Sequence, residues 1–352
     1  MTTSPGVRLP YQWPTPELHP AVIEVVSGVR ALDELYHEFR EWASERTLPT
    51  TASTSWLFPT VEINAGVMPW GVVGRDGYGR LQGLILLLDE EVEGRAITSL
   101  VGTDQGNRGT LTVESPELAE EMAREIASVM LGKNDSRHLV MGPLDAQDPR
   151  VHAFASALPG AHLIEDDPIP VVRRESADAK DYMSQGMRRT LRKARNRLER
   201  DALEMSLHFT VDADEIAEAL PTIEQCHRDR DHVHGRASDL DDDRARRLWQ
   251  ERLRRLAAIG ELELATLRIN GEFAAHAIGA TNYPVYRVLE GRFVTEWARY
   301  APGRLLEAAV LQRVLDDEAF TTLDWMTAVA PETLLAANDV DHMVLVHLGP
   351  SV

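Results

Sequence analysis

The chain contains one order of elements twice, and this repetition limits the folds that are open to it. The first copy reads as a strand over 71–75, a glycine-bearing turn, strands over 80–88 and 95–101, and a helix that begins at Ser115-Pro116. The second reads as strands over 262–268 and 273–281 around Asn270-Gly271, a strand over 286–293 and a helix over 302–317. Asn-Gly between two apolar runs is a strong hairpin signal. The repetition predicts two copies of one α/β unit, although a hairpin followed by a helix is also common without duplication.

The length of the chain agrees with two domains, because 352 residues exceed the size at which one hydrophobic core keeps growing. We expect an α/β fold of two tandem lobes, each a mixed, mostly antiparallel sheet flanked by helices. The boundary is predicted after Pro168-Ile169-Pro170, with an N-terminal lobe over 1–174 and a C-terminal lobe over 175–352.

The remaining elements follow from apolar periodicity and from prolines. Residues 1–20 contain five prolines and are predicted to be an extended lead-in. Apolar side chains at helical spacing, together with capping residues, predict further helices over 29–43, 178–203, 212–227 and 240–259. The closing strands are expected over 322–326 and 342–348.

Charge and cysteine content restrict the partners and the compartment. A net charge of −19 repels polyanions and disfavours a general nucleic-acid or anionic-membrane binder. Cys226 is the single cysteine, so no intramolecular disulfide forms, which fits a reducing compartment. The longest apolar run, 84–88, is too short to span a bilayer, and the first 20 residues lack a signal-peptide core. We therefore expect a soluble, cytoplasmic protein without a membrane partner.

Four stretches of the second half resemble the CelD/BcsL-type acetyltransferase family, which is similar to the GNAT superfamily and, more distantly, to the FemABX peptidyl transferases. They are the Arg-rich helix over 187–198, the hairpin over 262–275, the strand-to-helix junction Gly291-Arg292-Phe293 with 297–306, and Thr322-Leu323-Asp324-Trp325-Met326. The most distinctive piece is Arg299-Tyr300-Ala301-Pro302-Gly303-Arg304-Leu305-Leu306. The resemblance implies two GNAT-like lobes, an acyltransferase activity and acetyl-CoA or another acyl-CoA as the donor.

The sequence departs from the family pattern at two places. After Asp324 the family usually continues through a glycine and a Tyr-Lys pair, and the segment 328–338 contains neither. The usual phosphate loop of spaced glycines is reduced to the stretch over 299–304. The assignment of acetyl-CoA as the donor therefore rests on the resemblance, and the residues that form the closing wall of the pocket are not identified.

The junction before the helix over 302–317 suits a pyrophosphate group. Pro302 fixes the first turn, and Gly303 allows a ligand to approach the free N–H groups of a helix N-terminus. Arg299 and Arg304 add guanidinium groups that bond phosphate, and Leu305 completes the turn. The alternative is an ordinary helix start whose arginines lie in solvent.

Acyl transfer needs a base for the attacking group and an acid for the leaving thiolate. Glu290 lies in a largely apolar strand, where we expect burial to raise its carboxyl pKa, and it is our first candidate for the base. His276 is a second candidate, and Tyr300 is the candidate acid. The alternatives are a satisfied core histidine at 276 and an ion pair of Glu290 with Arg268 or Arg287.

Candidates for substrate binding come from three elements. Tyr286 shares a strand face with Glu290, and Asp324 lies on the strand after the last long helix. Arg188 and Arg192 belong to the Arg-rich helix, whose basic face is either a solvated surface or a site for CoA phosphates, an acidic acceptor or a tRNA. The glycine-rich loop over 102–109 either borders a cleft between the lobes or is a simple turn.

No metal is expected. Cys226-His227, Asp229, His232 and His234 crowd one helix end, but they lack the regular spacing of zinc ligands, and no Asp or Asn partner for a Cys–His nucleophile is identifiable.

The resemblance and these residues together predict transfer of an acyl group, most simply acetyl, to an amine or hydroxyl of a small molecule or saccharide. Two alternatives stay open: a FemABX-like transferase that takes its donor from aminoacyl-tRNA, and a non-catalytic GNAT-like binding or scaffold protein.

Overall fold

The computed structural model describes residues 21–46, 48–63, 68–92, 94–103, 107–133, 137–326 and 336–349 of the chain. The lead-in over 1–20, part of the loop over 102–109 and most of the segment over 328–338 lie outside the described residues. None of the described helices combines the length and the apolar character that crossing a bilayer requires.

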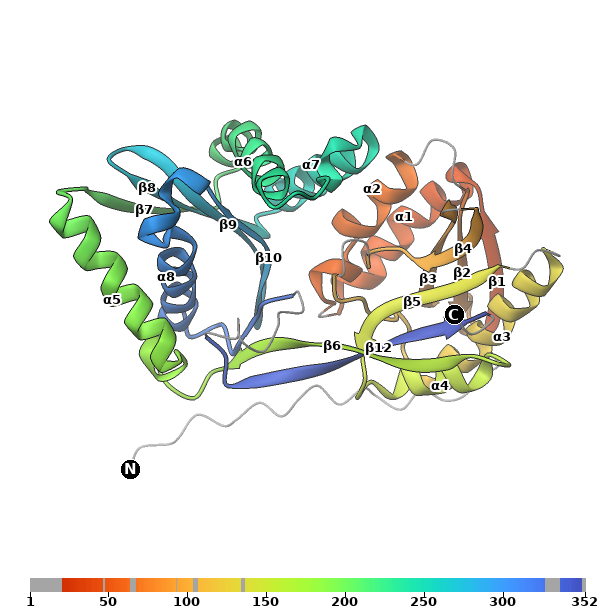
Figure 1. Ribbon diagram of the computed structural model, residues 1–352. Coiled ribbons are helices and arrows are strands. Elements are labelled where there is room, and N and C mark those ends of the chain that lie inside the picture. Colours follow the sequence, from red (N-terminus) through yellow and green to blue (C-terminus); the bar gives the residue numbers. More distant parts are fainter. Residues whose placement is uncertain are drawn as a thin grey trace, which may run out of the picture.

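The first half runs from strand β1 to strand β6 (Figure 1). Its elements are β1 (Val22–Ser27), α1 (Val29–Ser44), α2 (Thr54–Ile63), β2 (Met68–Arg75), β3 (Leu81–Val92), β4 (Arg95–Leu100), α3 (Pro116–Gly132), β5 (His138–Asp145), α4 (Pro149–Ala157) and β6 (His162–Arg173).

The second half repeats this order from β7 to β11 and ends in β12. Its elements are α5 (Gln185–Arg200), β7 (Met205–Thr210), α6 (Ala213–Val233), the 3-10 turn η4 (Asp239–Asp241), α7 (Asp243–Ala258), β8 (Leu262–Ile269), β9 (Glu272–Asn282), β10 (Val285–Phe293), the 3-10 turn η5 (Thr295–Tyr300), α8 (Pro302–Asp316), β11 (Thr322–Asp324) and β12 (Asp339–Leu348).

Capping residues set the helix starts. Ser115 accepts a hydrogen bond from the Leu118 N–H, and Pro116 follows it, as the sequence predicts. The Arg-rich helix α5 begins at Gln185, later than the expected residue 178, because Ser184 accepts a bond from the N–H of Met187 and the preceding residues form a 3-10 turn.

The described strands form one continuous sheet in the order β1-β2-β3-β4-β5-β12-β6-β11-β10-β9-β8-β7. The pairs β4–β5 and β10–β11 are parallel, and the other neighbouring pairs are antiparallel. Helix α3 follows β4 and leads to β5, and α8 connects β10 to β11 in the same way. The predicted mixed, mostly antiparallel α/β fold is confirmed, and the topology repeats as the two hairpins suggest.

The two halves exchange their last strands. Strand β6 of the first half pairs with β11, while β12 of the second half lies between β5 and β6. Figure 1 shows β6 and β12 running side by side beneath both halves. The predicted boundary between 174 and 175 stays a prediction, since the chain continues from β6 into the second half while β12 returns to the first.

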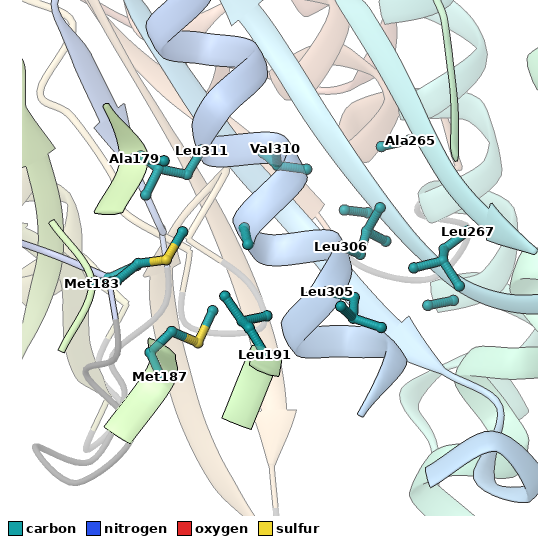
Figure 2. Packing of buried hydrophobic residues seen from close by; sticks show 14 of the residues in the cluster. Ala179, Met183, Met187, Leu191, Ala265, Leu267, Leu305, Leu306, Val310 and Leu311 are labelled. Atoms are coloured by element: carbon teal, nitrogen blue, oxygen red, sulfur yellow. The ribbon is translucent and has the colours of Figure 1, made fainter. Parts of the chain in front are cut away.

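Three apolar clusters hold the fold together. One packs α3 and α4 against the first half of the sheet, and a second packs α5 and α8 against the second half. Figure 2 shows the second of these, with side chains of α8 lying between α5 and β8. The third cluster is shared, because α1 and α2 contribute to it together with α6 and α7. The halves are therefore joined by a common core as well as by the sheet.

Candidate active site

Glu290 lies at the centre of a hydrogen-bond network in the middle of the second half. Its Oε1 is 2.9 Å from His227 Nδ1 and 3.0 Å from His276 Nε2, and its Oε2 accepts a bond of 2.9 Å from Trp249 Nε1. The three partners come from α6, β9 and α7. His227 Nε2 lies 3.2 Å from Asp231 Oδ2, so His227 stands between two carboxylates. We call Asp231, His227, Glu290 and His276 the His–Glu network.

The structure corrects the expectation that burial raises the pKa of the Glu290 carboxyl. Burial does raise the pKa of this carboxyl, but the hydrogen bonds from His227 and His276 outweigh burial and hold the pKa well below its usual range. Glu290 is therefore ionised at neutral pH, and its partners are the two histidines rather than Arg268 or Arg287. An ionised carboxylate accepts hydrogen bonds only, so both ring nitrogens that face it donate.

His276 is buried at 1% exposure, and the structure brings it into contact with Glu290 as part of one site. Because Nε2 donates to Glu290, a neutral ring has its lone pair on Nδ1. Within the described residues, Nδ1 has no hydrogen-bond partner. Because this lone pair has no partner, a neutral His276 ring is able to accept a proton at Nδ1.

The His–Glu network lines a cavity of about 920 Å³ that runs along β10 to the start of α8. Ala301, Gly303 and Arg304 line its far end. Ala301 is in the left-handed conformation, with φ 49°, and provides no side-chain cap for α8. A Cβ at Gly303 would lie 3.2 Å from the Phe293 ring, which is closer than ordinary contact. The first turn of α8 thus presents backbone N–H groups to the cavity at a position where a side chain would press against the Phe293 ring.

Arginines that the sequence did not single out line the same cavity. The Arg230 guanidinium lies over the Phe293 ring at 4.1 Å. Arg292 and Arg236 line the same cavity and interact electrostatically with Arg230. Burial first, and then the two neighbouring guanidinium groups, lower the pKa of Arg230. An anion bound beside these guanidinium groups would relieve their mutual repulsion.

A second cavity, of about 490 Å³, meets the first at Glu290 and extends between the two halves. Trp56 and Glu90 of the first half line it together with α7. Asn107, Asp239, Leu289 and Glu290 line both cavities. The glycine-rich loop over 102–109 therefore does border this cleft, at Asn107.

The predicted acid, Tyr300, is not among the residues that line either cavity. Its hydroxyl donates to Asp201 Oδ2 at 2.9 Å, and desolvation together with this bond raises the pKa of Tyr300. Arg299 pairs with the same carboxylate at 2.7 Å and lies over the Tyr300 ring at 4.9 Å. This placement corrects the geometry that we expected for Tyr300 and Arg299, since both side chains are held by Asp201.

The other residues predicted for the α8 start divide between the cavity and the core. Arg304 lines the cavity and forms an ion pair of 2.7 Å with Glu307. Pro302 and Leu305 are buried, and Leu305 packs in the cluster of α5 and α8 (Figure 2). Their contribution is to fix the turn.

Two substrate-binding candidates lie outside both cavities of the cleft. Tyr286 is 1% exposed, and its hydroxyl donates to Glu263 Oε1 at 3.1 Å in the core. Asp324 is also 1% exposed and lies 3.2 Å from Arg108 Nη1 of the first half. Both side chains make contacts that stabilise the fold, and the ion pair of Asp324 with Arg108 links the halves.

Arg188 and Arg192 lie on the exposed face of α5. The buried face of this helix carries Met187, Leu191, Ala194 and Leu198, as the spacing predicts. Neither arginine lines a cavity of the cleft.

His227, Arg230 and Asp231 were missed as a site. They lie at positions i, i+3 and i+4 of α6, which places them on one helix face, and this spacing was readable in the sequence. The contact between α6 and β10 could not be predicted from the sequence, because it depends on the tertiary fold. In the described part of the chain, no cluster of His, Cys, Asp or Glu could hold a metal ion.

Comparison with known proteins finds a family match within the second half. Residues 185–332 match the family model described as an acetyltransferase (GNAT) domain, which is the CelD/BcsL type that the sequence resembles. A search of curated proteins finds no match.

Solved structures share the fold over most of the chain. FemX matches with a TM-score of 0.54 and 11% identity, over 79% of this chain and 83% of its own. The C-terminal domain of a putative lysylphosphatidylglycerol synthetase from Agrobacterium fabrum matches with a TM-score of 0.53 and 11% identity, over 90% and 92%. A tandem GNAT protein from the clavulanic acid biosynthesis pathway matches with a TM-score of 0.50 and 18% identity, over 94% and 100%. At these identities the likeness shows the fold alone.

Proposed function

We propose that the protein transfers an acyl group, acetyl in the simplest case, from acyl-CoA to an amine or hydroxyl of a small molecule or saccharide, because residues 185–332 match the model of a GNAT-type acetyltransferase domain. The observation that carries the proposal is the His–Glu network at the junction of two cavities, one of which leads to the uncapped start of α8.

The far end of the 920 Å³ cavity fits the phosphates of acyl-CoA. Gly303 and Arg304 offer backbone N–H groups at a helix start, and the guanidinium groups of Arg230 and Arg292 add positive charge. In the first half, the equivalent helix α3 is capped by its own Ser115, so its first turn is already satisfied. Acyl-CoA supplies an activated acyl group as a thioester.

The His–Glu network is suited to accept the proton that the attacking group loses. Glu290 remains charged and has little tendency to hold a proton itself, because its pKa lies below the usual range. It orients His276 and stabilises positive charge on the rings that donate to it. We therefore assign the base to His276 and the positioning role to Glu290.

An irregularity in β10 provides a further polar group. The register with β9 shifts between Val288 and Glu290, and Leu289 has no paired residue there. A bulge of this kind leaves backbone groups outside the ladder, and a backbone N–H at this position can stabilise the developing oxyanion. Tyr300 is bound to Asp201, so we assign no side chain to protonate the thiolate.

The test is ligand binding followed by turnover. Acetyl-CoA and CoA should raise the unfolding temperature of the protein, since a ligand at about 100 times its Kd stabilises by ~2.7 kcal/mol. Release of free thiol from acetyl-CoA in the presence of amine or hydroxyl acceptors measures the transfer. No shift with acetyl-CoA, together with a shift or turnover that needs aminoacyl-tRNA, would replace this proposal with the tRNA-dependent alternative. Absence of any shift and any turnover would favour the non-catalytic one.

A further inference from the structure

A third cavity, outside the cleft, has an arginine without hydrogen-bond partners in its wall. Its volume is about 750 Å³, and none of its described lining residues lines either cavity of the cleft. We infer that this third cavity binds a small zwitterion that carries a carboxylate and an ammonium group, as an α-amino acid does. The carboxylate binds Arg287 of β10, and the ammonium group binds the aspartates around it.

Arg287 lacks the hydrogen-bond partners that a desolvated guanidinium needs. Its side chain is 11% exposed, and it lines the third cavity. Nε and Nη1 are buried and have no hydrogen-bond partner in the described part of the chain. Burial lowers the pKa of Arg287, against the opposing effect of the Asp324 charge. A guanidinium that leaves water without gaining hydrogen bonds costs free energy, so a further partner is expected for this group.

The nearest carboxylate does not satisfy Arg287. Asp324 Oδ2 lies 3.9 Å from Nε, which is beyond hydrogen-bond distance. The same oxygen accepts a bond of 3.2 Å from Arg108 Nη1, and Oδ1 accepts a bond of 2.8 Å from the N–H of Met326. Both oxygens of Asp324 are therefore engaged, and a shift of this carboxylate toward Arg287 would weaken its other bonds.

The other aspartates of the third cavity are engaged as well. They bond to arginines other than Arg287: Asp145 and Asp341 to Arg108, Asp339 and Asp341 to Arg173, and Asp148 to Arg150. The anionic partner that Arg287 lacks is therefore not among the described residues. A carboxylate on a ligand fits this role, because a guanidinium binds the two carboxylate oxygens with two parallel hydrogen bonds.

The charge of the third cavity favours a zwitterion over a simple anion. Four arginines and five aspartates line it, which leaves a formal charge of −1. A bare anion adds to this negative charge, whereas a zwitterion leaves it unchanged. The side chains of Asp145 and Asp339 are 40% and 49% exposed, and a carboxylate oxygen that accepts one bond has a second lone pair for an ammonium donor. Arg287 and these aspartates together match the two charges of an amino acid.

The third cavity is separate from the cleft although it also touches both halves. Asn107 lines both cavities of the cleft, whereas the next residue, Arg108, lines the third. Asp145 ends β5 in the first half, and Arg287 belongs to β10 in the second. A zwitterion between them stabilises the junction of the halves and leaves the cleft unoccupied.

Glycine is the probe, because its carboxylate and ammonium group are present in every α-amino acid. Acetate lacks the ammonium group, and methylamine lacks the carboxylate. Equilibrium dialysis of the full chain with each radiolabelled compound measures the Kd, and thermal unfolding of each variant without ligand measures its stability. Arg287→Met removes the guanidinium and keeps a long side chain. Arg268→Met is the matched control, because Arg268 is an exposed arginine of β8 that lines none of the three cavities.

We expect the Kd of glycine to be at least about tenfold lower than that of acetate or methylamine. Arg287→Met should raise the Kd of glycine at least about tenfold, and Arg268→Met should leave it unchanged. Without ligand, Arg287→Met should unfold at the wild-type temperature or above it, because the substitution removes a desolvated cation that has no hydrogen bonds.

Three outcomes would overturn the inference. Acetate that binds as well as glycine would remove the need for an ammonium group, and glycine binding that survives Arg287→Met would place the ligand elsewhere. A lower unfolding temperature of unliganded Arg287→Met would give the arginine a structural role instead. These measurements need no acyl donor, so their outcome does not depend on the proposed function.

Discussion

Trp249 donates its indole N–H to Glu290 Oε2 over 2.9 Å, so a single side chain both lines the cavity between the halves and holds the central carboxylate. Any acceptor that packs against this indole is placed one hydrogen bond away from the His–Glu network. Under the proposed function, we therefore expect binding of an acceptor in this cavity to affect the network through Trp249.

Replacing Glu290 by Gln should reduce both turnover and stability. An amide NH₂ cannot accept the hydrogen bonds that His227, His276 and Trp249 give to the carboxylate, so at least one buried donor loses its partner. We expect kcat to fall by ~10²–10⁴-fold and the free energy of unfolding by about 1–3 kcal/mol. Steady-state kinetics and chemical denaturation measure the two effects. Wild-type kcat in this variant would refute the role of the network.

The stabilising effect of Glu290 should depend on pH in a defined direction. Because its pKa is lower in the folded protein than in the unfolded chain, the contribution is fully present above the ordinary pKa of about 4.3 and is lost as pH falls through the lower folded value. The difference in unfolding free energy between the wild type and Glu290→Gln should thus be largest above about pH 5 and shrink below about pH 4. A constant difference down to pH 3 would contradict this assignment.

A bulky side chain at residue 303 should weaken donor binding. Gly303→Val places atoms against the Phe293 ring and over the first turn of α8, so the Kd for CoA should rise at least about tenfold. Gly186→Ala is the control, since Gly186 lies in the first turn of α5 and a Cβ there meets only ordinary contact, at 3.6 Å from Ser184 Oγ. Calorimetric titration with CoA distinguishes the two variants. Equal affinities in them would remove the phosphate site from α8.

Arg108 should stabilise the junction between the two halves. Its guanidinium lies 3.2 Å from the buried Asp324, 2.6 Å from Asp341 and 3.0 Å from Asp145. Arg108→Ala removes the nearest cation from the buried Asp324 and leaves it with Arg287, whose Nε lies 3.9 Å away, and we expect a loss of ~3–5 kcal/mol in the free energy of unfolding. Arg108→Lys keeps the charge and should lose less. Urea denaturation of both variants provides the comparison.

Cys226 should be unreactive in the folded protein. Burial and, after it, the charge of Glu290 raise the pKa of the thiol to about 12, so the thiolate is scarce at neutral pH. Labelling with iodoacetamide should be slow in buffer and become fast in denaturant. Cys226→Ala should retain activity, and an inactive but folded variant would reopen a nucleophilic role for the thiol.

The repeated hairpin, the mixed sheet and most helices could be predicted from the sequence because they depend on local periodicity and capping. Strand β6 could not, because Pro168 and Pro170 interrupt its pattern and suggested a linker. The register of β6 with β12 shifts between Asp341 and Met343, opposite the segment around Pro168. An irregular ladder accommodates a residue that has no N–H to donate, so the strand continues through the prolines.

The candidate site was predictable only in part, for a similar reason. Glu290 and His276 were found because polar residues are conspicuous in apolar strands. The ionisation of Glu290 was not predictable, because its hydrogen-bond partners include residues of α6 and α7, which lie far from it along the chain. Tyr300 failed as a prediction of position, since Asp201 at the end of α5 holds its hydroxyl.

The exchange of β6 and β12 has a consequence for protein synthesis. When β5 has left the ribosome, its neighbour in the finished sheet, β12, is still to be translated. Translation proceeds at ~5–20 residues per second, so the edge of β5 stays unpaired for roughly tens of seconds. During that time an exposed strand edge can pair with another nascent chain. Efficient production of this protein should therefore depend on chaperone capacity more than its final stability suggests.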